Sequence, residues 1–227
     1  MSASKEITVD IVSDAVCPWC FVGQKRLDKA IASLPDIDVS ISWRPFQLDP
    51  TIPPEGKDRK EYMQAKFGDG DRLRQIHARL EETGRAEGIA FDFDAIKVSP
   101  NTLDAHRLIR WAASAGDAIQ GKVARRLFQL YFEEGKNIGD HEVLIEAAHE
   151  CGMDEAVARA LLATDADKAE VRTEIDTANR MGVTGVPCFL IEGRYAVMGA
   201  QDTAALAEAI RKVSEAKERG ELENAAG

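Results

Sequence analysis

The sequence has few cysteines and contains no long hydrophobic run. Its 227 residues include only 4 cysteines, too few for a secreted protein that disulfide bridges hold together. The best apolar run, residues 185–191, is far shorter than the roughly 18 residues that a membrane span needs. Residues 1–10 are polar and lack the apolar stretch of a secretory signal. We therefore expect a cytoplasmic protein that does not enter a membrane.

Positive charge is also scarce. Lys and Arg total 29 against 39 for Asp and Glu, which gives a net charge of −10. That balance argues against a nucleic-acid partner and against docking on an anionic membrane, because both need a basic face. The hydrophobic fraction of 44% and the charged fraction of 30% are ordinary for a globular protein. A chain of this size can bury a sizeable core in one or two domains.

Hydrophobic periodicity predicts a strand, a helix and a second strand at the start of the chain. Apolar and polar residues alternate over residues 7–13 and again over residues 37–43. Between them Phe21, Leu27 and Leu34 recur at helical spacing, which predicts a helix over residues 19–34. This order favours a parallel strand pair joined by a crossover helix.

Prolines and glycines over residues 45–56 mark a loop, and mostly helical spacing follows up to residue 181. Asp140 and Asp154 are expected as N-caps, whereas residues 91–98 are ambiguous. We expect helices over residues 57–67, 71–87, 103–115, 121–133, 140–151, 154–163 and 168–181.

Strand patterns return near the end of the chain, over residues 187–191 and 195–198, and a final helix is expected over residues 201–218. We predict an α/β domain formed by residues 1–56 and 182–218. Residues 57–181 form an all-helical insertion domain, and residues 219–227 form a flexible tail.

The motif Cys17-Pro18-Trp19-Cys20 follows the first strand and opens the first helix. Unpaired N–H groups and the positive end of the helix dipole stabilise a thiolate there, so we expect the pKa of Cys17 to lie below its free value of about 8.5. Two intervening residues place the thiols one turn apart, within reach of an easily reduced disulfide. The motif thus indicates redox chemistry, and two core thiols are the simpler alternative.

Half of a zinc site is another interpretation of this motif, but it needs a second ligand pair. The other cysteines stand alone and the histidines lack ligand spacing, so we expect no metal; these residues are Cys151, Cys188, His77, His106, His141 and His149.

Three further candidates come from their positions along the chain. Asp14 lies three residues before Cys17 and can accept the proton of Cys20, unless it only caps a loop. Trp43 and Phe46 line a substrate groove or pack in the core at the strand end.

Glycines flank the turn before Val186 and Pro187, and the proline directly precedes a strand. A cis bond there would expose the backbone of Val186 for pairing with a peptide or with glutathione. An ordinary loop proline is the simpler alternative.

Four segments together resemble a known family. They are S-D-A-V-C-P-W-C-F-V-G at residues 13–23, W-R-P-F-Q-L at 43–48, S-P-N-T-L-D-A-H-R-L at 99–108 and G-V-T-G-V-P at 182–187. Over roughly residues 6–215 the chain resembles the DsbA-like oxidoreductases of the thioredoxin superfamily, in particular the cytoplasmic FrnE-like group.

This resemblance implies a thioredoxin-like fold with a large helical insertion that covers the active site. It implies thiol–disulfide exchange with protein or small-molecule thiols and disulfides, without metal or organic cofactor and with glutathione as a candidate redox partner. The resemblance implies that Cys17 is the nucleophile and Cys20 the resolving thiol, and that Pro18 and Trp19 tune the reduction potential. It also implies that Pro187 is a cis-proline and that the backbone of Val186 pairs with the substrate.

A rival group has the same architecture: 2-hydroxychromene-2-carboxylate isomerases and kappa-class glutathione transferases. These enzymes usually carry Ser where Cys17 stands and lack the second cysteine, so the intact pair favours redox chemistry. Asp202 could hold the γ-glutamyl end of glutathione or merely cap the last helix. A non-catalytic binding module is the third alternative. The apolar faces of the insertion fit a homodimer interface or packing within one chain.

Overall fold

The computed structural model describes residues 5–68 and 70–222, which form six strands and nine helices. The strands are β1 (Lys5–Ser13), β2 (Ile37–Pro45), β3 (Lys57–Asp58), β4 (Val98–Ser99), β5 (Cys188–Ile191) and β6 (Tyr195–Met198). The helices are α1 (Pro18–Ala32), α2 (Arg59–Phe67), α3 (Gly70–Glu87), α4 (Leu103–Ser114), α5 (Asp117–Phe132), α6 (His141–Glu150), α7 (Glu155–Leu162), α8 (Lys168–Arg180) and α9 (Thr203–Glu218). The predicted tail lies partly at residues 223–227, outside the described residues.

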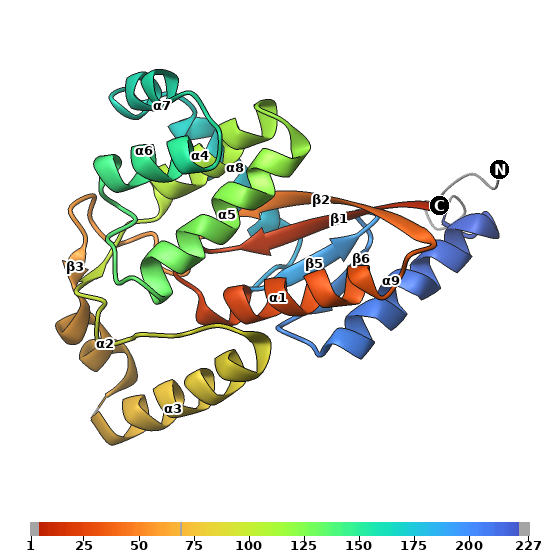
Figure 1. Ribbon diagram of the computed structural model, residues 1–227, viewed down its shortest axis with the longest axis horizontal. Coiled ribbons are helices and arrows are strands. Elements are labelled where there is room, and N and C mark those ends of the chain that lie inside the picture. The colour runs from red at the N-terminus through yellow and green to blue at the C-terminus, as the bar shows by residue number, and fades with distance from the viewer. Residues whose placement is uncertain (1–4, 69, 223–227) are drawn as a thin grey trace.

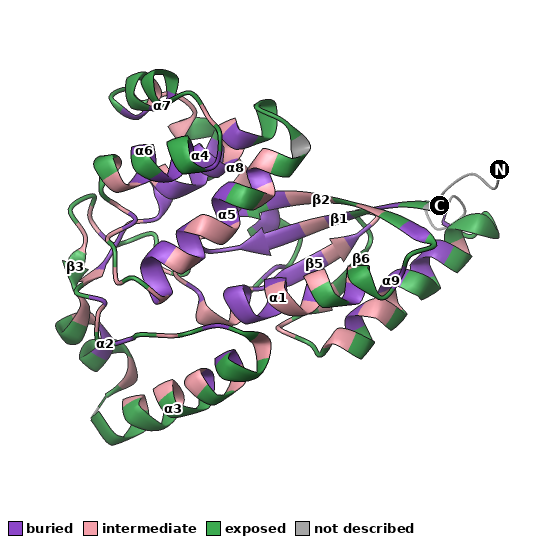
Figure 2. Cartoon of the chain, viewed as in Figure 1, coloured by how far each residue is buried: buried purple, intermediate pink, exposed green. Residues whose placement is uncertain are grey.

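A four-stranded sheet in the order β2-β1-β5-β6 forms the centre of the molecule. The first two strands run parallel and β5 runs antiparallel to both of its neighbours, which confirms the predicted strand–helix–strand opening. Helices α1 and α9 lie side by side along one face of this sheet (Figure 1). Strand β1 is buried along most of its length (Figure 2). Ile7, Val9 and Ile11 belong to the main core, whereas Val12 packs in a smaller cluster with Ala178 of α8.

The chain over residues 57–181 is mostly helical, as predicted, but it also contains one short strand pair. Strand β3 pairs with β4, so α2 begins at Arg59, two residues later than expected. Asp58 caps the helix by accepting a hydrogen bond from the N–H of Glu61 at 2.9 Å. Asp140 and Asp154 cap α6 and α7, as their sequence positions predicted.

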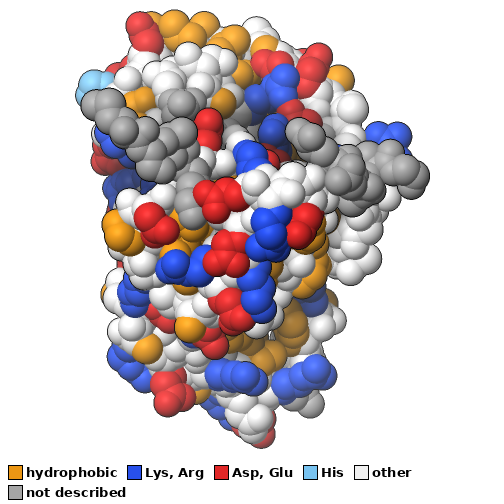
Figure 3. Space-filling model, turned by 90° about the vertical axis from the view of Figure 1, so that its right-hand side faces the viewer, with side chains coloured by type: hydrophobic (Ala, Val, Ile, Leu, Met, Phe, Trp, Pro, Cys, Tyr) orange, Lys and Arg blue, Asp and Glu red, His pale blue; other side chains and the backbone are white. Residues whose placement is uncertain are grey.

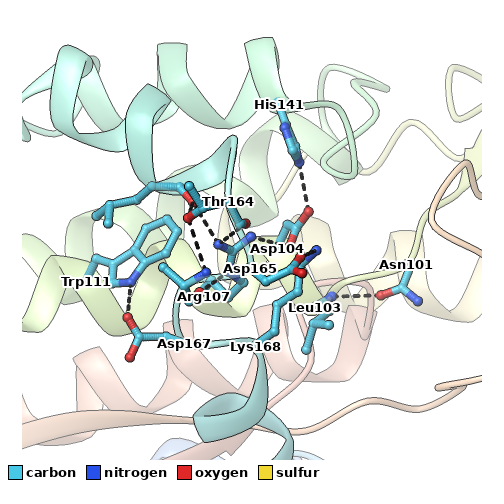
Figure 4. Close-up of polar contacts among 12 residues, drawn as sticks. Asn101, Leu103, Asp104, Arg107, Trp111, His141, Thr164, Asp165, Asp167 and Lys168 are labelled. Carbon is cyan, nitrogen blue, oxygen red and sulfur yellow. Dashed lines mark hydrogen bonds and ion pairs between the residues drawn. The ribbon is translucent and has the colours of Figure 1, made fainter.

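A buried arginine fastens the loop after α7 to α4. Arg107 has no exposed surface, and its guanidinium donates hydrogen bonds to the carbonyl oxygens of Leu161, Thr164 and Ala166 (Figure 4). It also pairs with the carboxylate of Asp104 at 2.8 Å. These bonds satisfy a charge that would otherwise be costly to bury.

The surface near the two termini carries charges of both signs. Figure 3 shows Lys and Arg side chains interspersed with Asp and Glu on this face, with small apolar areas between them. Within residues 5–68 and 70–222, no helix combines the length and the apolar character that a membrane span requires.

Candidate active site

Cys17 and Cys20 lie at the N-terminal end of α1, directly after the turn that follows β1. Cys17 is the N-cap residue and Pro18 opens the helix, where a missing N–H costs nothing. The N–H of Cys17 donates to the carbonyl oxygen of Asp14, and that of Cys20 to the carbonyl oxygen of Cys17, both at 3.0 Å. Both thiols are free. One helical turn therefore holds two thiols at the positive end of the helix dipole.

The two thiols have different surroundings. Cys17 is 4% exposed and lines a cavity of about 510 Å³, whereas Cys20 is 1% exposed and does not line it. Burial, reinforced by a hydrogen bond with Cys17, raises the pKa of Cys20 well above its usual value. A molecule in the cavity can therefore contact Cys17, while Cys20 lies behind it.

Val186 and Pro187 lie opposite the first thiol. The thiol of Cys17 donates to the carbonyl oxygen of Val186 at a sulfur–oxygen distance of 3.6 Å, and Val186 also lines the cavity. The peptide bond between Val186 and Pro187 is cis. Pro187 packs against α1, because a methyl group at Gly23 would lie only 3.0 Å from its Cγ. The structure thus brings together four residues that were singled out from two distant motifs.

Asp14 is 1% exposed and lines the same cavity. Its Oδ2 accepts a hydrogen bond from the N–H of Leu48 at 2.8 Å. Its Oδ1 lies 3.5 Å from Nε2 of His106, which also contacts the carbonyl oxygen of Phe46 at 2.8 Å. The sequence did not identify His106 as a neighbour of Asp14, because a contact between the turn after β1 and α4 leaves no local pattern.

The remaining predicted residues lie in different environments. Trp19 lines the cavity beside Cys17. Trp43 is 5% exposed and packs against Phe128, and Phe46 is buried with the cluster on the other face of the sheet; neither lines the cavity. We therefore assign Trp43 and Phe46 to the core.

Asp202 is the N-cap of α9, where its carboxylate accepts a hydrogen bond from the N–H of Ala205 at 2.7 Å. Of its two predicted roles, the structure thus shows the simpler one, the cap of the last helix. Asp202 does not line the cavity that contains Cys17.

Helices α2 and α3 form the outer wall of the cavity. An ion-pair cluster ties α3 to α1, because Glu87 contacts both Arg26 and Lys29 at 2.6 Å. The residues that the structure describes contain no group of three or more His, Cys, Asp or Glu side chains that could hold a metal ion.

The chain is similar to a known family and to solved structures over most of its length. Residues 8–211 match the DSBA-like thioredoxin domain family. A probable DsbA oxidoreductase from Streptomyces coelicolor is 31% identical, with a TM-score of 0.82 over 91% of this chain and 89% of that chain.

Two further structures share the fold at lower identity. A 2-hydroxychromene-2-carboxylate isomerase is 15% identical, with a TM-score of 0.70 over 95% of this chain and 98% of that chain. The cytosolic disulfide reductase DsbM of Pseudomonas aeruginosa, solved with GSH, is 20% identical, with a TM-score of 0.56 over 94% of this chain and 98% of that chain. These likenesses confirm the expected thioredoxin-like architecture with its helical insertion. The chain belongs to the family of DSBA-like thioredoxin domains.

Proposed function

We propose that this protein is a thiol–disulfide oxidoreductase in which Cys17 is the nucleophile and Cys20 the resolving thiol. The observation that carries the proposal is the asymmetry of the pair: Cys17 faces a cavity and Cys20 is buried behind it. Membership of the DSBA-like family and the 31% identity to a probable DsbA oxidoreductase support the same reaction class.

The proposed cycle has two exchange steps. The Cys17 thiolate attacks one sulfur of a substrate disulfide, forms a mixed disulfide and releases the first substrate thiolate. Cys20 then loses its proton and attacks the sulfur of Cys17, which forms the Cys17–Cys20 disulfide and releases the second substrate thiolate. Two electrons pass from the protein to the substrate, and each released thiolate takes up a proton. The reverse sequence oxidises a dithiol substrate, and no metal or organic cofactor takes part.

The neighbouring residues have supporting roles in this proposal. The backbone of Val186, held by Pro187, pairs with the substrate beside Cys17. Asp14 accepts the proton that Cys20 releases, consistent with its burial near the pair. Asp14→Asn should therefore slow release of the mixed disulfide by more than its formation. Equal rates for both steps in the variant and the parent protein would remove Asp14 from the mechanism.

Pro18 and Trp19 set the reduction potential of the pair, as the family resemblance implies. We also propose that the protein belongs to the FrnE-like group and resides in the cytoplasm. The α/β domain and the helical insertion domain meet at residues 56/57 and 181/182 in this proposal. Glutathione is the proposed recycling partner, and its presence in the DsbM structure supports that choice.

The test is equilibration of the purified protein in graded buffers of reduced and oxidised glutathione, followed by alkylation and mass mapping. We expect a reversible disulfide between Cys17 and Cys20 that Cys17→Ser and Cys20→Ser both abolish. A midpoint near roughly −270 mV would indicate a reductant, and one near roughly −120 mV an oxidant.

The alternative function, a glutathione-dependent isomerase or transferase, predicts a different result. Glutathione would then bind saturably or stay attached at Cys17, no Cys17–Cys20 disulfide would form, and turnover would survive Cys20→Ala. Asp202→Ala would weaken glutathione binding. That combination would replace the dithiol cycle, whereas partner binding that needs neither thiol would indicate a non-catalytic module.

A further inference from the structure

The cavity at Cys17 has the size and lining of a small-molecule site. Its volume of about 510 Å³ lies within the range of roughly 300–1,000 Å³ that is typical of ligand pockets. Apolar side chains from four separate segments form its walls, among them Trp19, Leu48, Ile52, Leu80 and Phe93. Such a lining fits an apolar, aromatic body better than a polar peptide backbone, which would leave its N–H and carbonyl groups without partners.

Three cationic side chains also line this cavity: Arg59, Lys66 and Arg79. Within the described residues, none of them has an acidic ion-pair partner. Arg59 is half-buried, with its guanidinium 5.9 Å from the ring centroid of Tyr131. Lys66 and Arg79 are exposed and lie on α2 and α3. One cation thus lies in the wall of the cavity and two lie towards solvent.

Two acidic groups, Asp14 and Asp49, also line this cavity. Oδ2 of Asp14 accepts from the N–H of Leu48, whereas its buried Oδ1 lies 3.5 Å from Nε2 of His106 and has no hydrogen-bond partner among the described residues. Asp49 accepts from the N–H and the hydroxyl of Thr51, at 3.0 and 2.5 Å. The three cationic side chains therefore outnumber the two carboxylates in the lining of the cavity, and they lie on α2 and α3, whereas Asp14 lies in the turn before α1.

His77 adds a neutral polar atom to the wall. Its ring stacks on Phe93 with centroids 4.2 Å apart, and its buried Nε2 has no hydrogen-bond partner among the described residues. Burial, with a contribution from Arg59, lowers the pKa of His77, so the ring is neutral at pH 7.

We propose that the substrate of this site is a small aromatic disulfide or thiol that carries an acidic group. The aromatic body lies against the apolar walls, the carboxylate or sulfonate binds Arg59, Lys66 and Arg79, and the sulfur meets Cys17. This inference rests on the thiol–disulfide exchange proposed above. For a disulfide, the reduced protein supplies two electrons, so one disulfide becomes two thiols while Cys17 and Cys20 become a disulfide.

Binding can be tested without any redox step, in the double variant Cys17→Ser/Cys20→Ser. The probes are anilinonaphthalene sulfonate and phenylnaphthylamine, which share their aromatic body and differ in the anionic group. We expect the sulfonate to bind about tenfold more tightly than the neutral probe, as the sum of three partly exposed charge contacts. Arg59→Gln, Lys66→Gln and Arg79→Gln together should abolish that preference, and restoring Lys at position 59 should recover part of it.

The matched control removes the same number of positive charges from the same two helices, at residues that do not line the cavity. Lys60→Gln, Arg72→Gln and Arg85→Gln together replace three exposed cations of α2 and α3, and they should leave the preference for the sulfonate unchanged. Equal affinities for both probes, or equal losses in the two triple variants, would overturn the proposed anion selectivity whatever the redox result.

The kinetic experiment uses the reduced parent protein with dithiobis(nitrobenzoate), which is anionic, and dithiodipyridine, which is neutral. Rates are normalised to the reaction of free glutathione with each reagent. The normalised anionic-to-neutral ratio should fall about tenfold in the cavity triple variant and stay constant in the control. Faster reduction of a peptide disulfide such as that of insulin, unaffected by the cavity variants, would identify a protein substrate instead.

Discussion

The thiol of Cys17 lies 3.6 Å from the carbonyl oxygen of Val186, although the two residues come from opposite ends of the chain. The sheet produces this contact, because β1 pairs with β5 and places Val12 opposite Cys188. The turn after β1 and the loop before β5 therefore meet at the same end of this strand pair. Any substrate that binds beside Val186 is thereby placed against the thiol that attacks it.

The four cysteines should differ in their rate of alkylation by iodoacetamide. Burial raises the pKa of Cys20, Cys151 and Cys188, so a smaller fraction of each is thiolate at pH 7. In the reduced protein we expect Cys17 to be modified first and the other three at least about tenfold more slowly. Mass mapping over time measures the order, and fast modification of Cys151 or Cys188 would contradict it.

Two helix glycines should respond in opposite ways to replacement by alanine. At Gly121 the new methyl group meets the flexible guanidinium of Arg125 at 2.8 Å and Nε1 of Trp43 at an ordinary contact distance of 3.8 Å, so the higher helix propensity of alanine should stabilise by about 0.5–1 kcal/mol. At Gly23 the methyl group meets Pro187 at 3.0 Å and Phe189 at 3.1 Å. Overpacking costs about 1–3 kcal/mol, so we expect a net loss of about 1 kcal/mol in urea unfolding.

The same two variants separate a local effect on the site from a general effect on stability. A shift of Pro187 also moves the carbonyl group of Val186, so Gly23→Ala should slow disulfide exchange at Cys17 in the folded protein. Gly121→Ala should leave that rate unchanged. Equal exchange rates in both variants would show that the contact of Pro187 with α1 does not position the thiol.

Arg107 should be far more important for stability than Arg110, which lies one turn further along α4. Arg107→Met leaves three carbonyls, at the end of α7 and in the loop that follows it, and Asp104 without their buried donor (Figure 4), which should cost about 3–5 kcal/mol. The side chain of Arg110 is 39% exposed, so Arg110→Met should cost less than about 1 kcal/mol. Urea unfolding followed by circular dichroism measures both. Similar losses in the two variants would refute a structural role specific to Arg107.

The ion pairs that fasten α3 to α1 should make stability depend on pH in the acid range. Burial alone would raise the pKa of Glu87, but hydrogen bonds from Lys29 and Arg26 outweigh burial and lower it. A pKa below the unfolded value of about 4.3 gives stability that is full above that pH and is lost as the pH falls through the folded-state pKa. Glu87→Gln should therefore flatten the decline in unfolding free energy below about pH 4.3.

The control for this experiment is Glu82→Gln, which alters an exposed carboxylate of the same helix that has no ion pair within the described residues. This variant should retain the acid-dependent loss of the parent protein. If Glu87→Gln and the parent had the same pH profile, the contacts of Glu87 with Arg26 and Lys29 would contribute nothing to stability.

Local sequence patterns predicted most of the elements but missed features that depend on distant partners. Lys57 and Asp58 were assigned to a helix because their own neighbours are helical, yet pairing with Val98 and Ser99 makes them a strand. Of the ambiguous residues 91–98, the first seven form a loop in which Phe91 and Phe93 pack against Phe132, and Val98 begins β4. Hydrophobic periodicity does not predict such contacts, because they form between segments that are far apart in the chain.

The sequence by itself determined the order of the helices and of the four strands of the central sheet, the caps at Asp140 and Asp154, and the Cys17–Cys20 pair one helical turn apart. Each of these depends on residues within a few positions of one another. Only the tertiary structure decided that Cys17 faces a cavity and Cys20 does not, and that this cavity is lined by cations of α2 and α3. These properties arise where separate segments pack together, and the free energy of that packing is shared among residues that no local pattern connects.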